Sequence, residues 1–149
     1  MNKTIHELTS LNIADNDDEL IIYDTSANDS KKITKGNLCN NSYSTEEQKT
    51  GGTWIDGKPI YRKVIDTGAL PNNTTKFVAH NISNLGKVIH IYGYSYGGDF
   101  LPLPYTSANS IAYSVQIYAD STNIGIRTGA DRSSYSSSYV VLEYTKTTE

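Results

Sequence analysis

The sequence predicts an all-β protein, in which a short N-terminal β-hairpin precedes a jelly-roll-like β-sandwich. One observation is residue usage: the 149 residues include 12 Tyr and 11 Gly but only two Phe and one Trp. Tyrosine favours half-buried pleated surfaces, and glycine favours turns. The other is that apolar residues alternate with polar ones in short runs, which turn formers separate. Regular short strands of this kind are typical of sandwiches and jelly rolls, and no long helical period competes with them.

The first segment, 1–41, contains the expected hairpin. Glu19–Asp24 reads as a strand, residues 25–30 are turn formers, and Lys31–Thr34 reads as the returning strand. A single helical turn is expected over 35–38.

This segment has too few apolar residues for a core of its own, and a chain below about 40 residues usually needs oligomerisation or covalent staples. We therefore expect it to pack on copies of itself or on a larger structure. The apolar residues expected to make that contact are Leu20, Ile22, Tyr23 and Ile33.

Residues 42–52 are polar and are interpreted as a linker or collar, and 53–149 as the β-sandwich. In that domain Asp56-Gly57 is a tight-turn signal between Trp54-Ile55 and a strand that begins near Lys58. The other expected strands are Arg62–Asp66, Phe77–Asn81, Lys87–Tyr96, Ile111–Ala119, Asn123–Arg127 and Tyr139–Lys146.

Four of these strands have one face that can be assigned from the alternation. A long loop is expected from Gly97 to Tyr105. The inward or shared faces are expected to carry Val88, His90, Tyr92, Tyr94 and Tyr96; Ile111, Tyr113, Val115, Ile117 and Ala119; Ile124 and Ile126; and Val140, Leu142 and Tyr144.

Several function classes are not expected. The net charge is −3, with no basic patch for nucleic acid, and no apolar run reaches the roughly 20 residues that span a bilayer. A single cysteine, Cys39, can form neither an intrachain disulfide nor a zinc cluster. The acidic run 15–19 lacks the glycine and the distal glutamate of a calcium loop. No nucleophile motif or paired carboxylates are present, so we expect no enzyme, no metal and no cofactor.

A binding surface is the positive expectation. Residues 92–98 alternate tyrosine with glycine and serine, and tyrosine gives a rigid contact area with a polar tip. Sugars suit such surfaces, because their apolar faces rest on rings. The candidate receptor-binding residues are Tyr94, Tyr96, Asp99 and Tyr105. The serine-rich run 133–138 is interpreted as a surface loop.

Four stretches resemble the C-terminal domains and the small N-terminal hairpins of bacteriophage fibre and adhesin proteins. They are Tyr43–Gln48 continuing through Trp54–Tyr61, Thr67–Thr74, Tyr139–Thr148, and Asp18–Asp24 with Lys31–Thr34.

The resemblance implies a homotrimer of β-sandwich knobs on the virion, made in the host bacterial cytoplasm and docked through its N-terminal segment on capsid or tail proteins. It implies no catalytic residues and no receptor site. Because only a short segment precedes the knob, a stubby head fibre is favoured over a long tail fibre. A tail or baseplate receptor-binding protein, and a capsid decoration without a receptor, remain alternatives to a fibre that binds host-surface carbohydrate.

Overall fold

The computed structural model describes residues 19–25, 28–34 and 42–148 of the chain. The chain divides into two compact units, Met1–Asn40 and Asn41–Glu149. The helical turn expected over 35–38 lies outside the described residues.

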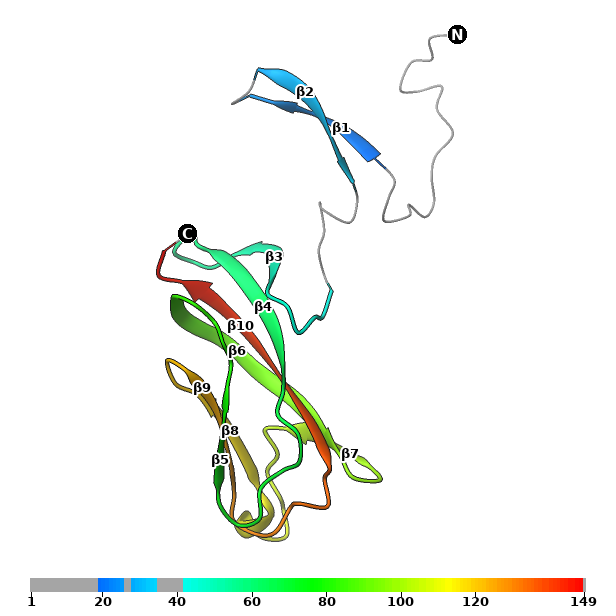
Figure 1. Cartoon of the computed structure of the whole chain (residues 1–149), viewed down its shortest axis with the longest axis vertical. Coiled ribbons are helices and arrows are strands. Elements are labelled where there is room, and N and C mark those ends of the chain that lie inside the picture. The colour runs from blue at the N-terminus through cyan, green and yellow to red at the C-terminus, as the bar shows by residue number, and fades with distance from the viewer. Residues whose placement is uncertain (1–18, 26–27, 35–41, 149) are drawn as a thin grey trace. The chain divides into compact units, whose positions relative to one another are not determined.

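The first unit contains the expected β-hairpin. β1 (Glu19–Asp24) and β2 (Asp29–Thr34) pair antiparallel, with Leu20 opposite Ile33 (Figure 1). The returning strand begins two residues earlier than expected. Asn28 adopts a left-handed backbone conformation in the turn, which asparagine tolerates better than most residues. None of the described side chains of this hairpin is buried.

The second unit consists of two antiparallel sheets (Figure 1). The five-stranded sheet has the order β3-β4-β10-β6-β7, and the three-stranded sheet the order β5-β9-β8. In chain order the strands are β3 (Gln48–Thr53), β4 (Pro59–Asp66), β5 (Thr75–Ala79), β6 (Leu85–Tyr96), β7 (Phe100–Leu103), β8 (Val115–Ala119), β9 (Asn123–Thr128) and β10 (Ser137–Lys146).

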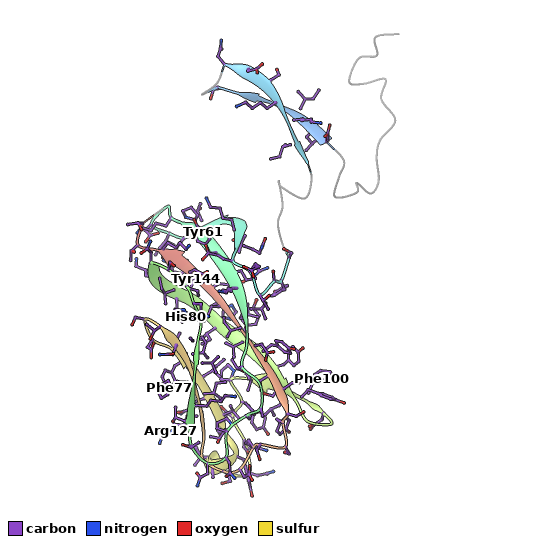
Figure 2. The ribbon with its side chains drawn as sticks, in the orientation of Figure 1. Tyr61, Phe77, His80, Phe100, Arg127 and Tyr144 are labelled. Atoms are coloured by element: carbon purple, nitrogen blue, oxygen red, sulfur yellow. The ribbon has the colours of Figure 1, made fainter. Side chains whose placement is uncertain are left out.

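One apolar core joins the two sheets, as in a β-sandwich. Val140, Leu142 and Tyr144 of β10 are fully buried in it, together with Ile124 and Ile126 of β9. Figure 2 shows Tyr144 inside this unit and Phe100 at its outer side. The predicted all-β class and the inward faces of β9 and β10 are therefore confirmed.

The strand expected over Ile111–Ala119 is only half correct, because Ile111–Tyr113 form a 3-10 turn and β8 begins at Val115. Ile111 is 88% exposed, although the alternation placed it inward. Serine side chains explain the difference: Ser110 Oγ accepts a hydrogen bond from the Ala112 N–H, and Ser114 Oγ accepts one from the Ser107 N–H. Such local bonds offer the backbone an alternative to a strand ladder.

The long loop expected from Gly97 to Tyr105 is also replaced by regular structure. β7 pairs with β6 after a tight turn in which Gly98 has a φ of 104°, and Leu101 and Leu103 alternate into the core. The short apolar alternation after the glycines was the signal for this strand.

The segment interpreted as a linker, 42–52, contains most of β3, which pairs with β4. Trp54 and Ile55 lie in the connecting turn rather than in a strand. There the Gly57 N–H donates to the Trp54 carbonyl, and Gly57 has a φ of 81°. Asp56-Gly57 predicted this turn. The strand before it ends at Thr53, two residues earlier than expected.

Candidate functional site

The outer face of the five-stranded sheet is lined with aromatic rings. On β6, Tyr94 lies opposite Tyr139 of β10, and Tyr96 lies opposite Phe100 of β7. The ring centres are 5.7 Å apart in the first pair and 5.0 Å apart in the second. Tyr94 and Phe100 are 42% and 72% exposed, so these rings form a surface rather than a core.

A hollow of about 430 Å³, which we call the tyrosine groove, opens on this face. Its outer wall comes from the segment before β3, where the Ser44 carbonyl accepts a hydrogen bond from the Val64 N–H at 2.8 Å. The segment thus lies along β4 and leaves a space above β10 and β6. The residues that line the groove are Tyr43, Ser44, Thr45, Val64, Tyr92, Gly93, Tyr94, Tyr139 and Val141.

A network of polar contacts holds the Tyr43 wall in place. The Arg62 guanidinium lies 4.4 Å from the centre of the Tyr43 ring, and the Tyr43 and Tyr92 hydroxyls are 3.0 Å apart. Tyr92 also donates to Glu143 Oε1, which Arg62 binds at 2.9 Å. The Arg62 and Glu143 side chains are largely buried. The wall is therefore fixed before any ligand arrives, and a preorganised site loses less entropy on binding.

The electrostatics of this network keep the Tyr92 hydroxyl protonated. Burial raises the pKa of Tyr92 well above its usual value, and the hydrogen bond with Tyr43 and the charge of Glu143 add to that increase. The groove accordingly presents neutral hydroxyls and apolar ring faces. Such a surface can stack on the apolar face of a sugar and exchange hydrogen bonds with its hydroxyls.

The four candidate receptor residues lie in different places. Tyr94 lines the groove, and Tyr96 is on the same face but stacks on Phe100 beyond it. Asp99 lies in the β6–β7 turn, where the Tyr135 hydroxyl bonds to it. Tyr105 is half-buried against the core, and its backbone pairs with Val115.

Sequence reasoning did not select Tyr43, Tyr92 or Tyr139 for the site. The alternation placed Tyr92 on the same face as Tyr94, so this pattern could have identified Tyr92 as a further candidate residue of the site. Tyr43 and Tyr139 are far from Tyr94 in sequence. The strand order places Tyr139 beside Tyr94, and the Ser44–Val64 bond holds the segment with Tyr43 at the same hollow.

The four expected anchoring residues lie on β1 and β2. Leu20 is half exposed and Ile33 is partly exposed, and they face each other across the hairpin. The side chains of Ile22 and Tyr23 lie outside the described part.

Two histidines, His80 and His90, contact neighbouring residues of the fold. His80 is buried, and its Nδ1 accepts from the Ile82 N–H at 3.1 Å (Figure 2). The His90 ring packs 4.5 Å from that of Tyr92. Within 19–25, 28–34 and 42–148, no cluster of histidine, cysteine and acidic side chains could hold a metal ion. In the same ranges, no helix is long and apolar enough to cross a membrane.

Comparisons with protein-family models, with curated proteins and with solved structures found no match.

Proposed function

We propose that this chain is a bacteriophage fibre protein that is anchored to the virion by its N-terminal hairpin and adheres to host-surface carbohydrate through its knob. The observation that carries the proposal is the tyrosine groove. It combines four ring walls with hydroxyl groups in a hollow of about 430 Å³, within the range of small-molecule sites.

The groove suits a sugar better than a purely apolar ligand. Its tyrosines present ring faces and hydroxyls together, and Ser44 and Thr45 add further polar groups at the rim. In this proposal a pyranose ring stacks on Tyr94 or Tyr139, beside Tyr43 and Gly93, which also line the groove. The resemblance of Tyr43–Gln48 and Tyr139–Thr148 to phage fibre and adhesin domains supports the fibre part of the proposal, and the tyrosine groove alone supports the carbohydrate part.

The exposure of the hairpin supports an anchoring role. A two-stranded hairpin is marginally stable alone in water, and here Leu20 and Ile21 are exposed on opposite faces. Burial of both faces requires contact with other copies or with the particle. We therefore propose a homotrimer whose hairpins dock on a capsid or tail protein. The eight strands of the second unit match the number in a jelly roll, which is the sandwich type proposed for the knob.

A glycan array probed with the full chain tests the adhesion proposal, with surface glycans of host cells as the second probe. Tyr94→Ala should weaken binding about fivefold to thirtyfold, since stacking on one ring contributes on the order of 1–2 kcal/mol. Tyr118→Ala is the matched control, because Tyr118 is also 42% exposed but lies on β8 of the other sheet. It should bind as the unmodified chain does.

Three results would count against the groove. Absence of binding to any glycan or host cell would leave a capsid decoration without a receptor. Equal losses for Tyr94→Ala and Tyr118→Ala would mean that the effect is not local. A change in oligomeric mass for Tyr94→Ala, without a change in glycan binding, would assign this face to contact between copies.

A further inference from the structure

A second site is suggested by Arg132, which is surrounded by aromatic rings. Its guanidinium carbon lies 5.1 Å from the centre of the Tyr113 ring and 5.9 Å from those of Tyr105 and Tyr135. Two backbone bonds fix its position: the Arg132 N–H donates to the Pro71 carbonyl, and the Arg132 carbonyl accepts from the Tyr135 N–H. Segments from three parts of the chain thus converge on one cation, which we call the Arg132 cage.

The hydrogen-bonding capacity of this guanidinium is only partly used within the described residues. Nη2 donates to the Tyr113 carbonyl in an exposed position. Nε is buried and has no acceptor there. An arginine carries five N–H donors, and a buried donor without a partner costs about 1–3 kcal/mol. Nε is too deeply buried to be reached from outside, whereas Nη2 lies in an exposed position, so an outside acceptor would meet the guanidinium at its Nη edge.

The nearby carboxylates do not neutralise Arg132. Asp99 accepts from the Tyr135 hydroxyl, and Asp131 Oδ1 accepts from the backbone N–H and the hydroxyl of Ser133. Among the described residues no carboxylate lies within ion-pair distance of Arg132, whereas Arg62, Lys87 and Lys146 each have such a partner. The cage therefore holds a half-buried positive charge without an internal counter-ion.

We propose that the Arg132 cage binds the anionic group of an acidic polysaccharide, either a carboxylate or a phosphate. A guanidinium is the side chain best suited to the planar, two-oxygen edge of either group. The surrounding tyrosines offer hydroxyls and ring faces to the adjoining sugar. In its choice of a polysaccharide this inference rests on the proposed function. It differs from that function in placing the charged part of the ligand at the cage, outside the residues that line the tyrosine groove.

Small anions test the cage separately from adhesion. Methyl glucuronide and glycerol phosphate are titrated into the full chain, and the arginine Nε–H resonances are followed by NMR. The Arg132 signal should shift with either probe if the cage binds anions. Neutral methyl glucoside should leave it in place. A shift with one probe only identifies whether carboxylate or phosphate is the group recognised.

Polymers then test the ligand class. Polygalacturonate and poly(glycerol phosphate) are compared with neutral dextran, for Arg132→Gln and Arg132→Lys. Arg132→Gln should weaken binding of the acidic polymer about tenfold or more, as expected for loss of a charge-assisted hydrogen bond. Arg132→Lys should recover part of the affinity, because it retains the charge without the planar fork. Arg127→Gln, which removes an equal charge from the exposed face of β9, is the matched control.

The outcomes separate the two proposals. If small anions shift the Arg132 Nε–H resonance but no polysaccharide binds, the anion-binding role of the cage is supported and the adhesion proposal fails. If neutral glycans bind and Arg132→Gln has no effect on any ligand, adhesion stands and the cage is overturned. A lower melting temperature for both Arg132 variants, with unchanged anion binding, would mean that Arg132 serves only to join the loops.

Discussion

At the scale of single residues, Glu47 is the polar group that ties the start of β3 to the end of β10. One carboxylate oxygen binds the Lys146 ammonium, and the other accepts from the hydroxyl of fully buried Tyr144. Partial burial opposes ionisation of Glu47, but the bonds from Lys146 and Tyr144 outweigh it and hold the pKa below its ordinary value. Burial, followed by the hydrogen bond and the charge of Glu47, raises the pKa of Tyr144.

The lowered pKa gives a pH dependence with a definite sign. A carboxyl whose pKa is lower in the folded state stabilises the fold above the unfolded pKa, which is 4.5 for glutamate, and loses that effect as the pH falls through the folded value. We expect Glu47→Gln to lower the free energy of unfolding by about 1–2 kcal/mol near neutral pH. The melting temperature of this variant should fall less than that of the unmodified chain between about pH 5 and about pH 3.

Glu46→Gln is the matched control for that measurement, because it removes the same charge from the adjacent, exposed position. It should retain both the stability and the acid response of the unmodified chain. An acid response of Glu47→Gln equal to that of the unmodified chain would contradict the role given to this carboxylate.

At the scale of elements, the approach of β6 to β10 depends on a residue without a side chain. Gly93 lies in β6 between β10 and β7. A Cβ atom at this position would lie 2.0 Å from the Tyr139 carbonyl oxygen, which is a backbone atom and cannot rotate away. The same glycine forms part of the groove floor, so the fold and the candidate site share one steric requirement.

Gly93→Ala should therefore destabilise the protein by about 2–4 kcal/mol, since the two strands must separate to admit the methyl group. Gly52→Ala in β3 is the control: its Cβ would meet only ordinary contacts, at 3.5 Å and beyond, and the change should stay within about 0.5 kcal/mol. Chemical denaturation of both variants measures the difference. A Gly93→Ala protein as stable as Gly52→Ala would mean that this strand pair can adjust without cost.

At the scale of the whole molecule, the two units differ in how much apolar surface they bury. The second unit has a core shared by two sheets, whereas the first leaves Leu20 and Ile21 exposed on a two-stranded hairpin. The proposed trimer would cover those side chains in the assembled fibre.

Three chains of 16.4 kDa give a mass of about 49 kDa, which sedimentation or light scattering at micromolar concentration would detect. We expect Leu20→Asp combined with Ile21→Asp to reduce that mass while the near-ultraviolet circular dichroism of the knob is retained. Thr25→Asp, which adds a charge in the exposed turn, should leave the mass unchanged. A 16.4 kDa monomer for the unmodified chain would refute the trimer.

The sequence by itself determined the local features of this protein. The alternation of Val140, Leu142 and Tyr144 predicted an inward face because side chains of a strand point to opposite sides in turn. The turn at Asp56-Gly57 followed from the left-handed conformation that glycine accepts. The period of β6 likewise placed Tyr94 on the same face as Tyr92 and Tyr96, although only the folded structure shows that this face is the exposed one.

Tertiary structure decided which of these elements meet. The strand order places Tyr139 beside Tyr94, and the Ser44–Val64 bond brings Tyr43 to the same hollow, although long stretches of chain separate the three. Two departures from the predicted strands had a local cause instead: serine-to-backbone bonds replaced a strand at Ile111–Tyr113, and the glycine turn after Tyr96 returned the chain as β7. Alternation specifies a face, but contacts between distant residues specify its neighbours, so the tyrosine groove and the Arg132 cage exist only in the folded chain.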